Sequence, residues 1–338
     1  MSDETPHRRR PRYSGKHPRR FEEKYKERDP ERYAETVAKV LAAGKTPAGA
    51  HRPIMVAEIL EILAPRAGET AVDCTLGFGG HAREILARIS PGGRLIALDA
   101  DPIELPKTAA RLRALGFENI SAHRSNFAGL PKILAAENVA GADMILADLG
   151  VSSMQLDDPA RGFSFKTDGP LDMRMNPQRG RSALELLRKS SAENLVKLFG
   201  ENADEPHAQV LATALAGGTF STTSILTKTV CTALAGLRPE EIDLSVRRVF
   251  QALRIAVNDE FSALDAFLRN LPACLAPGGR VAVLTFHSGE DRRVKHAFEA
   301  GFRDGVYSEI TREVTRPGAE ERRANPRSAS TKLRWARR

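Results

Sequence analysis

Two hydrophobic rhythms alternate along the first half of the chain. Short runs of apolar and β-branched residues are separated by longer segments in which apolar residues recur every three or four positions. The short runs predict buried strands and the longer segments predict helices. The expected strands are residues 69–75, 93–100, 119–125 and 142–150, and the helices between them include residues 81–89 and 102–116. Strands that alternate with helices predict a parallel sheet with helices on both faces.

This rhythm stops near residue 150. Residues 151–180 are rich in Gly, Pro, Asp and Ser, and residues 181–240 carry helical patterns without strands. Apolar residues from Val246 to Leu271 then recur at three- and four-residue steps and predict one long helix. Residues 279–288 follow as a fifth strand. We therefore expect an α/β fold that is interrupted by a helical insertion.

These patterns divide the chain into three parts. Residues 1–50 are expected to be a basic, largely disordered extension with one helix over residues 31–43. Residues 51–155 and 246–338 form the α/β domain, and residues 156–245 form the helical insertion.

Charge gathers at the two ends of the chain. The 338 residues carry a formal net charge of +8, of which residues 1–50 and 303–338 contribute +5 each, so residues 51–302 are net −2. Basic ends on a nearly neutral body indicate contact with a polyanion such as nucleic acid. The alternative is that the ends are solvated tails that aid solubility.

Several protein classes are excluded by what the sequence lacks. No apolar run approaches the ~18 residues of a membrane-spanning helix, and the N-terminus lacks the apolar stretch of a secretory signal. Cys74, Cys231 and Cys274 are far apart and odd in number, which excludes a disulfide framework and a CxxC metal site. A cytoplasmic enzyme remains.

Three chemical signals follow the ends of predicted strands. A glycine-rich loop runs from Asp73 to His81, but its spacing is not that of a nicotinamide-binding fingerprint. Asp99 ends the next strand, where a carboxylate can accept hydrogen bonds from ribose hydroxyls. Asp148 and Ser152 follow the fourth strand, as ligand-binding groups or as a turn and helix cap. Because ligands bind outside the carboxyl ends of parallel strands, these signals together favour a nucleoside-type cofactor.

Longer motifs carry a family resemblance. They are the glycine loop with His81 and the segments at residues 148–165, 168–175, 247–260, 285–295 and 325–334. In this order they resemble the bacterial 16S rRNA (cytosine-N4)-methyltransferase H, or MraW-like, family over about residues 51–338. The resemblance implies the S-adenosylmethionine-dependent methyltransferase fold with a helical insertion for substrate recognition. It also implies N4-methylation of a cytidine in the decoding centre of 16S rRNA, within the small ribosomal subunit.

The resemblance also assigns site residues. The residues that match the family's S-adenosylmethionine contacts are Gly79, Gly80, His81, Asp99, Phe127, Asp148 and Gln155. The chain departs from the family pattern at Met154, which replaces a proline, and at Gly289, which replaces a leucine. Residues 296–324 form a short segment, and the first fifty residues lie outside the pattern.

Methylation of a cytosine amine sets its own chemical demands. The N4 lone pair is delocalised into the ring, so hydrogen-bond acceptors aimed at the amino protons would stabilise the charge that develops during attack. Asp148 and Ser152 are the catalytic candidates, although Asp148 could equally contact only the cofactor. A cytidine taken out of its stack needs an aromatic partner, for which Phe163 and Phe165 are candidates, or they are ordinary core residues.

Other polar residues of the second half of the chain allow more than one interpretation of their role. His287, with Glu290, Asp291 and Arg292 beside it, could face substrate, and metal binding is not expected because no second ligand stands at a suitable spacing. The polar positions on the long helix either face RNA phosphates or form a solvated face. They are Arg247, Arg248, Arg254 and Asn258.

Two other functions remain open beside rRNA cytosine-N4 methylation. One is a methyltransferase of the same fold that acts on another nucleic acid or on protein. The other is a ribosome assembly factor that keeps the fold without turnover. The sequence leaves the oligomeric state open, with a homodimer as one option.

Overall fold

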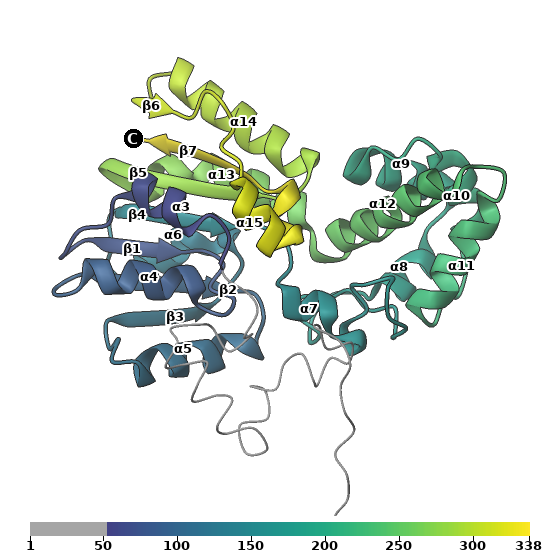
Figure 1. The fold of residues 1–338 in the computed structure, drawn as a ribbon, viewed down its shortest axis with the longest axis horizontal. Coiled ribbons are helices and arrows are strands. Elements are labelled where there is room, and N and C mark those ends of the chain that lie inside the picture. Colours follow the sequence, from purple (N-terminus) through teal and green to yellow (C-terminus); the bar gives the residue numbers. More distant parts are fainter. Residues whose placement is uncertain (1–52) are drawn as a thin grey trace, which may run out of the picture. The chain divides into compact units, whose positions relative to one another are not determined.

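A seven-stranded sheet forms the centre of the described part of the chain (Figure 1). The computed structural model describes residues 53–338, apart from the side chains of Ser153 and Met154. The helix expected over residues 31–43, and the disorder expected around it, lie outside the described residues.

Five strands are parallel and the last two complete the sheet in the antiparallel sense. The order across the sheet is β3-β2-β1-β4-β5-β7-β6. The strands are β1 (Thr70–Asp73), β2 (Arg94–Asp99), β3 (Ile120–Arg124), β4 (Ala142–Asp148), β5 (Leu275–Thr285), β6 (Glu309–Ile310) and β7 (Lys332–Arg337). The chain moves outward through β2 and β3 and then returns to β4 on the other side of β1. The carboxyl ends of β1 and β4 therefore form the topological switch point at which open α/β sheets bind ligands.

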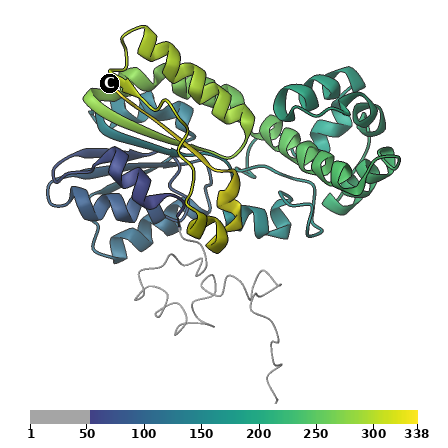
Figure 2. The same ribbon diagram turned by 45° about the horizontal axis from the view of Figure 1, so that its top comes forward.

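Helices cover both faces of the sheet, as predicted (Figure 2). On β2, Leu95 and Ala97 face one hydrophobic cluster and Ile96 and Leu98 face the other, because side chains alternate along a strand. The first cluster contains α3 (Val56–Leu63), α4 (Gly80–Ile89) and α5 (Glu104–Ala114). The second contains α6 (Leu130–Ala136), α13 (Glu260–Cys274) and α14 (Ser288–Arg303).

The residues between β4 and α13 supply a third hydrophobic cluster. They begin with α7 (Ser153–Asp157) and the short helix η3 (Pro159–Arg161) and continue with α8 (Ala183–Lys189), α9 (Ala192–Ala203), α10 (Ala208–Leu215), α11 (Thr223–Ala233) and α12 (Pro239–Asn258). The side chains of Ser182, Ser191 and Thr222 accept hydrogen bonds from the first turns of α8, α9 and α11, which fixes where these helices begin. The expectation of helices without strands over residues 181–240 is confirmed.

The long helix expected over residues 246–271 is wrong in one respect. It is two helices, α12 and α13, because Asp259 adopts a left-handed conformation with φ 52°. Apolar residues before this break, such as Leu253, pack into the insertion cluster, whereas Leu264 and Phe267 pack against the sheet. The three- to four-residue spacing continues through Asp259 without a Gly or Pro, so the pattern gave no signal of the turn.

The C-terminal part of the sheet was not anticipated. β7 inserts between β5 and β6, and its Arg334 is buried in an ion pair with Asp291 of α14, at 2.6 Å. The remaining elements are η2 (Phe127–Gly129), α15 (Ala319–Ala324) and η4 (Pro326–Ser330). Among the described residues, no helix combines the length and the apolar character that crossing a membrane requires.

Candidate active site at the carboxyl edge of the sheet

Asp99 holds the glycine loop in place. Its Oδ2 accepts a 2.7 Å hydrogen bond from the backbone N–H of Gly77, and its Oδ1 accepts one from Asp101 at 2.8 Å. The hydroxyl of Thr108 donates to the carbonyl of Gly77 from the other side. Each carboxylate oxygen keeps lone pairs for a further donor, so these backbone contacts are compatible with ribose recognition.

The glycines of this loop have different reasons to be glycine. A Cβ on Gly79 would lie 2.9 Å from Cγ2 of Thr108, and one on Gly80 would lie 2.9 Å from Cγ of Pro53. Packing against neighbouring side chains therefore requires glycine at positions 79 and 80. Gly77 has φ 49°, and a Cβ there would make only an ordinary contact with the carbonyl oxygen of Thr75, at 3.8 Å, so its backbone conformation rather than crowding favours glycine.

His81 is a buried histidine at the start of α4. Its Nε2 lies 2.9 Å from the carbonyl oxygen of Ile54, and its Nδ1 lies 3.8 Å from Oδ2 of Asp148. Burial lowers the pKa of His81, although Asp73 and other nearby charges act in the opposite sense. The structure thus brings His81, at the start of α4, close to Asp148, at the end of β4.

Three carboxyl groups gather at this edge, Asp73 buried and Asp99 and Asp148 half-buried. Burial raises the pKa of Asp73 and of Asp99 to about 6. Burial, and then the charge of Glu290, raises the pKa of Asp148 to about 7. The Oδ1 atom of Asp148 is buried without a hydrogen-bond partner. Such a group of acids favours a positively charged ligand, because a cation compensates the cost of ionising them.

Ser152 and Gln155 form a reciprocal pair around the first turn of α7. The Ser152 hydroxyl accepts from the backbone N–H of Gln155, and Oε1 of Gln155 accepts from the backbone N–H of Ser152. This is the geometry of a capping box. The side-chain amide of Gln155 also donates to Oδ2 of Asp101 at 3.0 Å. Ser152 and Gln155 therefore make hydrogen bonds within the protein at the switch point, in addition to any contact that they make with a ligand.

Arg161 connects the insertion to the same carboxylate. Its Nη1 donates to Oδ2 of Asp101 at 3.0 Å, and its Nη2 donates to the carbonyls of Arg174 and Met175. Although burial opposes it, hydrogen bonds from Ile103 and Gln155 and the charge of Arg161 hold the pKa of Asp101 below its usual value. Asp101 and Arg161 were not among the predicted site residues. Each lies two residues from a residue to which a site role was assigned, Asp99 and Phe163 respectively.

The predicted aromatic residues differ in their surroundings. Phe127 follows β3 in η2 and packs edge-on against Phe267, with ring centroids 5.6 Å apart, while part of its side chain stays exposed. Phe163 is 5% exposed and belongs to the insertion cluster, so it is a core residue. Phe165 is half-buried and packs edge-on against Phe250.

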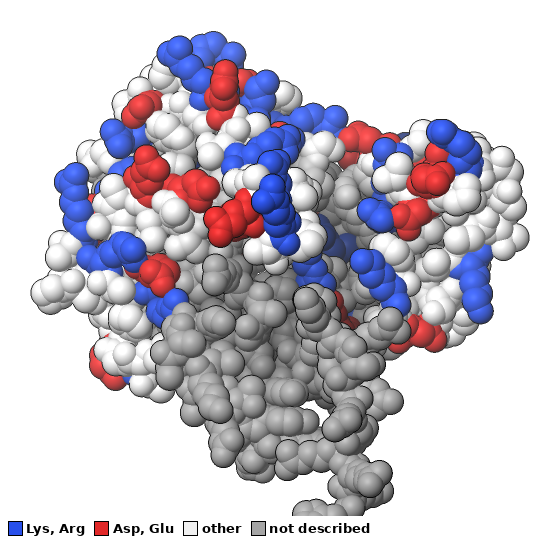
Figure 3. Space-filling view, in the orientation of Figure 1, with Lys and Arg blue, Asp and Glu red and all other residues white. Residues whose placement is uncertain are grey.

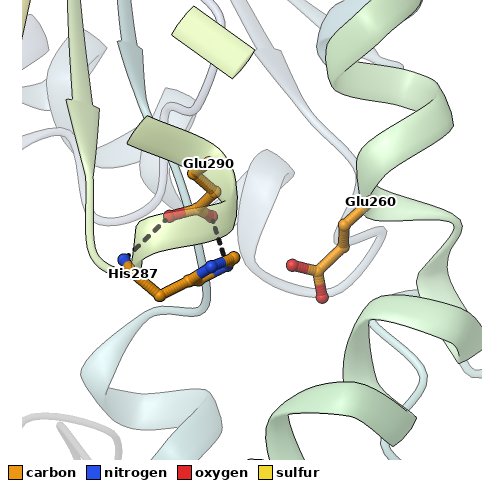
Figure 4. A group of neighbouring side chains, drawn as sticks. All are labelled: Glu260, His287 and Glu290. Atoms are coloured by element: carbon orange, nitrogen blue, oxygen red, sulfur yellow. Dashed lines mark hydrogen bonds and ion pairs between the residues drawn. The ribbon is translucent and has the colours of Figure 1, made fainter. Parts of the chain in front are cut away.

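A second charged group lies at the end of β5 (Figure 4). One ligand atom from each of Glu260, His287 and Glu290 falls within 4.8 Å of the other two. The expectation that His287 has no companion ligand is therefore wrong, because Glu260 comes from α13 and is far away in sequence. Both oxygens of Glu260 already accept hydrogen bonds from Arg254, at 2.8 Å each. A metal ion bound here would have to compete with that guanidinium.

The polar residues of the predicted long helix divide into two sets. Arg254 and Asn258 point inward, since Arg254 pairs with Glu260 and the Asn258 amide bonds to the backbone of Met173 and Met175. Arg247 is exposed and pairs with Asp243 on its own helix. Only the second kind of position suits a solvated face or a phosphate contact.

Gly289 is explained by its neighbour Phe261. A Cβ on Gly289 would lie 2.6 Å from Cζ of the Phe261 ring, so the ring fills the space that a side chain at position 289 would need. The guanidinium of Arg293 stacks on that ring, 3.6 Å from its centroid. Met154 has no described side chain.

Comparison with known proteins identifies the family. A sequence model described as the MraW methylase family matches residues 48–338. The chain belongs to this family. It is 49% identical over 346 residues to the ribosomal RNA small subunit methyltransferase H 1 of Lachnoclostridium phytofermentans, covering 99% of this chain and 94% of that protein. It is 50% identical over 344 residues to the methyltransferase H 2 of Alkaliphilus metalliredigens, covering 98% of each.

The predicted resemblance is thereby confirmed. This MraW-family chain is an S-adenosylmethionine-dependent methyltransferase, and its sheet has the fold class that we predicted. The family model begins at residue 48, whereas the two relatives also align with most of the first fifty residues. TrmN from Thermus thermophilus resembles the structure with a TM-score of 0.41 and 15% identity, covering 84% of this chain and 48% of TrmN.

The residues at the switch point fit this cofactor chemically. S-adenosylmethionine carries a positive sulfonium, an amino-acid end and a ribose. The carboxyl groups of buried Asp73 and half-buried Asp148 suit the positive groups, and Asp99 retains lone pairs for hydroxyl donors. The orphaned Oδ1 of Asp148 is the group that most needs a partner.

Proposed function

We propose that this methyltransferase transfers the methyl group of S-adenosylmethionine to N4 of a cytidine in the decoding centre of 16S rRNA, within the small ribosomal subunit. The names of its relatives support the ribosomal RNA substrate. The observation that carries the chemistry is the buried, unpartnered Oδ1 of Asp148 at the switch point. A hydrogen-bond acceptor is what a poorly nucleophilic amine needs beside it.

In this proposal, Asp148 orients the acceptor amine and takes up its proton. When bound, the cofactor supplies a methyl group that its sulfonium has already activated. N4 must lose one proton as it becomes methylated, and a carboxyl whose pKa is about 7 can hold a proton at physiological pH. Ser152 stands four residues further on and would present its hydroxyl to the same amine.

The cofactor contacts proposed for this chain are those that the family resemblance assigns. Asp99 would accept from ribose hydroxyls, and Phe127 would pack against the adenine. The loop at Gly79, Gly80 and His81 would face the methionine end, with Asp148 and Gln155 completing the set. We also propose that the helical insertion, residues 156–245, recognises the RNA and that the enzyme acts in the cytoplasm.

Charge is mixed on the face of the described residues that Figure 3 draws, where basic and acidic side chains are intermixed. This agrees with the net charge of −2 for residues 51–302, against +5 at each end of the sequence. Electrostatic attraction to phosphate would therefore come mainly from residues 1–50 and 303–338.

Methyl transfer from tritiated S-adenosylmethionine tests the substrate. Small subunits, free 16S rRNA, DNA and ribosomal protein would each be incubated with the full-length enzyme, followed by nucleoside digestion and mass spectrometry. N4-methylcytidine at one position of subunit rRNA is the expected product. Label in DNA or protein would favour another substrate, and cofactor binding without label would favour an assembly factor.

Two variants make this test specific to the site. Asp148→Asn should abolish most of the labelling. Asp143→Asn is a matched control, because Asp143 lies on the same strand and accepts a hydrogen bond from the backbone of Thr70 at 2.8 Å, which an asparagine oxygen can also do.

A further inference from the structure

His287 stands beside the proposed acceptor site without a role in it so far. Asp148, the last residue of β4, is paired in register with Leu284 of β5, and His287 follows three residues later as the N-cap of α14. The charge of Glu290, on the first turn of α14, acts on Asp148. The end of β5 therefore presents His287 at the same edge as Asp148.

Neighbouring groups fix the position of the His287 ring (Figure 4). Its Nε2 lies 3.3 Å from Oε1 of Glu290, while Oε2 of Glu290 accepts from the backbone N–H groups of Phe286 and His287. The Phe261 ring lies 5.7 Å away, centroid to centroid. Opposite Glu290 is the half-buried ion pair of Glu260 with Arg254.

The ring is held but its hydrogen bonding is incomplete. Both ring nitrogens are buried; Nε2 is paired with the Glu290 carboxylate at 3.3 Å, whereas Nδ1 has no hydrogen-bond partner. Buried polar atoms without partners are rare and unfavourable, and they occur where a ligand completes the site. A metal ion is the less favoured completion, because Arg254 already occupies both oxygens of Glu260.

A cytosine base offers the complement of this arrangement. Its Watson–Crick edge presents an amino donor at N4 beside an acceptor at N3. Asp148 presents an unpartnered acceptor, and Nδ1 of His287, the ring nitrogen that is not paired with the Glu290 carboxylate, can carry the N–H donor. Uracil reverses both groups, with a carbonyl at C4 and an N–H at N3, so a donor aimed at N3 would reject it.

We propose that His287 donates a ring N–H to N3 of the acceptor cytosine while Asp148 accepts from N4, so that the two residues together select cytosine. This assignment rests on the proposed function and names the group that reads its base. Glu290 acts as a positioning residue that holds the His287 ring. Flipped bases are commonly read in this way, through hydrogen bonds to the Watson–Crick edge.

Substitution of His287 is the first test. His287→Phe keeps a ring but removes the donor, and it should lower kcat/KM for small subunits by about tenfold to a hundredfold, the range for loss of a specific base contact. The Kd for S-adenosylmethionine, measured by calorimetry, should stay within about twofold, which also shows that the variant is folded. His287→Gln retains an N–H and should recover part of the activity. His296→Phe is the control, because His296 is an exposed histidine on the same helix.

An atomic change in the substrate is the sharper test. Small subunits would be reconstituted with 3-deazacytidine, which has a C–H in place of N3, at the acceptor position. The wild-type enzyme should lose about tenfold to a hundredfold on this substrate, whereas His287→Phe should lose little more than it already has.

The outcomes separate the two proposals. Equal losses on 3-deazacytidine for wild type and His287→Phe, or a wild-type rate for His287→Phe, would overturn the role of His287 while leaving the function intact. A wild-type reaction that forms no N4-methylcytidine on unmodified subunits would overturn both.

Discussion

The two halves of the sheet's carboxyl edge are built differently. At the ends of β1 and β2, Asp73 and Asp99 accept hydrogen bonds from the backbone of the loops around them. At the ends of β4 and β5, Oδ1 of Asp148 and the ring nitrogens of His287 are buried without a hydrogen bond of normal geometry, although Nε2 of His287 lies 3.3 Å from the Glu290 carboxylate. Three of the five buried side-chain atoms without such a hydrogen bond in the described part of the chain belong to these last two residues.

This difference indicates that the β1–β2 half is preformed for the cofactor, whereas the β4–β5 half is completed when substrate binds. The β1–β2 half is held by its own contacts, so it can receive a cofactor without rearrangement. The β4–β5 half retains buried polar groups whose hydrogen bonding a bound substrate can complete, which is a common feature of a site where chemistry takes place. Substitutions in the first half should therefore affect cofactor affinity, and those in the second half should affect the rate.

The largest expected effect is at Asp148. Asp148→Asn should slow single-turnover methyl transfer by about a hundredfold to a thousandfold, the range for loss of one preorganised group at a reacting centre. Cofactor affinity should fall much less. If saturating S-adenosylmethionine restores the full rate in rapid-quench assays, Asp148 only binds the cofactor and the two halves of the edge do not differ in this way.

Asp99 should show the opposite behaviour. Asp99→Ala removes a charge-assisted contact of about 1.5–3 kcal/mol, so affinity for S-adenosylmethionine should fall about tenfold to a hundredfold in calorimetry. The rate at saturating cofactor should stay near that of the wild type. Asp99→Asn, which can still accept from Gly77, should lie between them. An unchanged Kd for Asp99→Ala would remove the ribose assignment.

The buried acids predict an unusual dependence of stability on pH. The pKa of Asp148 rises from 3.8 in the unfolded chain to about 7 in the folded one, so the folded state binds the proton more tightly. This contribution to stability is complete below about pH 4 and is lost as pH rises through 7. In urea unfolding without cofactor between pH 5 and 7, Asp148→Asn should flatten the slope by up to about 1.4 kcal/mol per pH unit. Parallel slopes for the two proteins would mean that the carboxyl is ionised throughout.

The smallest effect concerns the basic extension. Deleting residues 1–30 should weaken binding to small subunits and make the dependence of log affinity on log salt shallower, because fewer counterions are released. Methyl transfer at saturating subunit should persist, since both halves of the edge lie beyond residue 53. Identical salt slopes would show that this segment takes no part in binding.

The sequence predicted the buried strands correctly where apolar residues serve only as core residues. The apolar runs of β1, β2 and β4 predicted buried parallel strands, because the residues on both of their faces are apolar. β7 was missed because Lys332 and Arg334 read as surface residues, whereas both pair with Asp291. A charge neutralised by a distant residue gives no local signal.

The candidate site was predictable only in its local motifs. Asp99 and Asp148 stand at strand ends, which the sequence reveals directly. The partnership of Arg254 and Glu260 with His287 depends on the turn at Asp259, which changes the direction of the chain between two helices. Aspartate adopts the left-handed conformation more readily than most residues, but it occurs far more often in other conformations, so a single Asp did not predict the turn or the contacts that depend on it.

The separation of β4 from β5 along the chain has a consequence for how the protein folds. These two strands pair directly, yet 126 residues lie between them. Closing a flexible loop of that length costs about 4 kcal/mol of chain entropy, and long-range pairing of this kind slows folding. The residues between β4 and α13 form a hydrophobic cluster of their own, and Asn258 at the end of α12 bonds to the backbone of Met173. If the insertion collapses first, β4 and β5 are joined by a short effective tether, so the segment that interrupts the sheet also accelerates its closure.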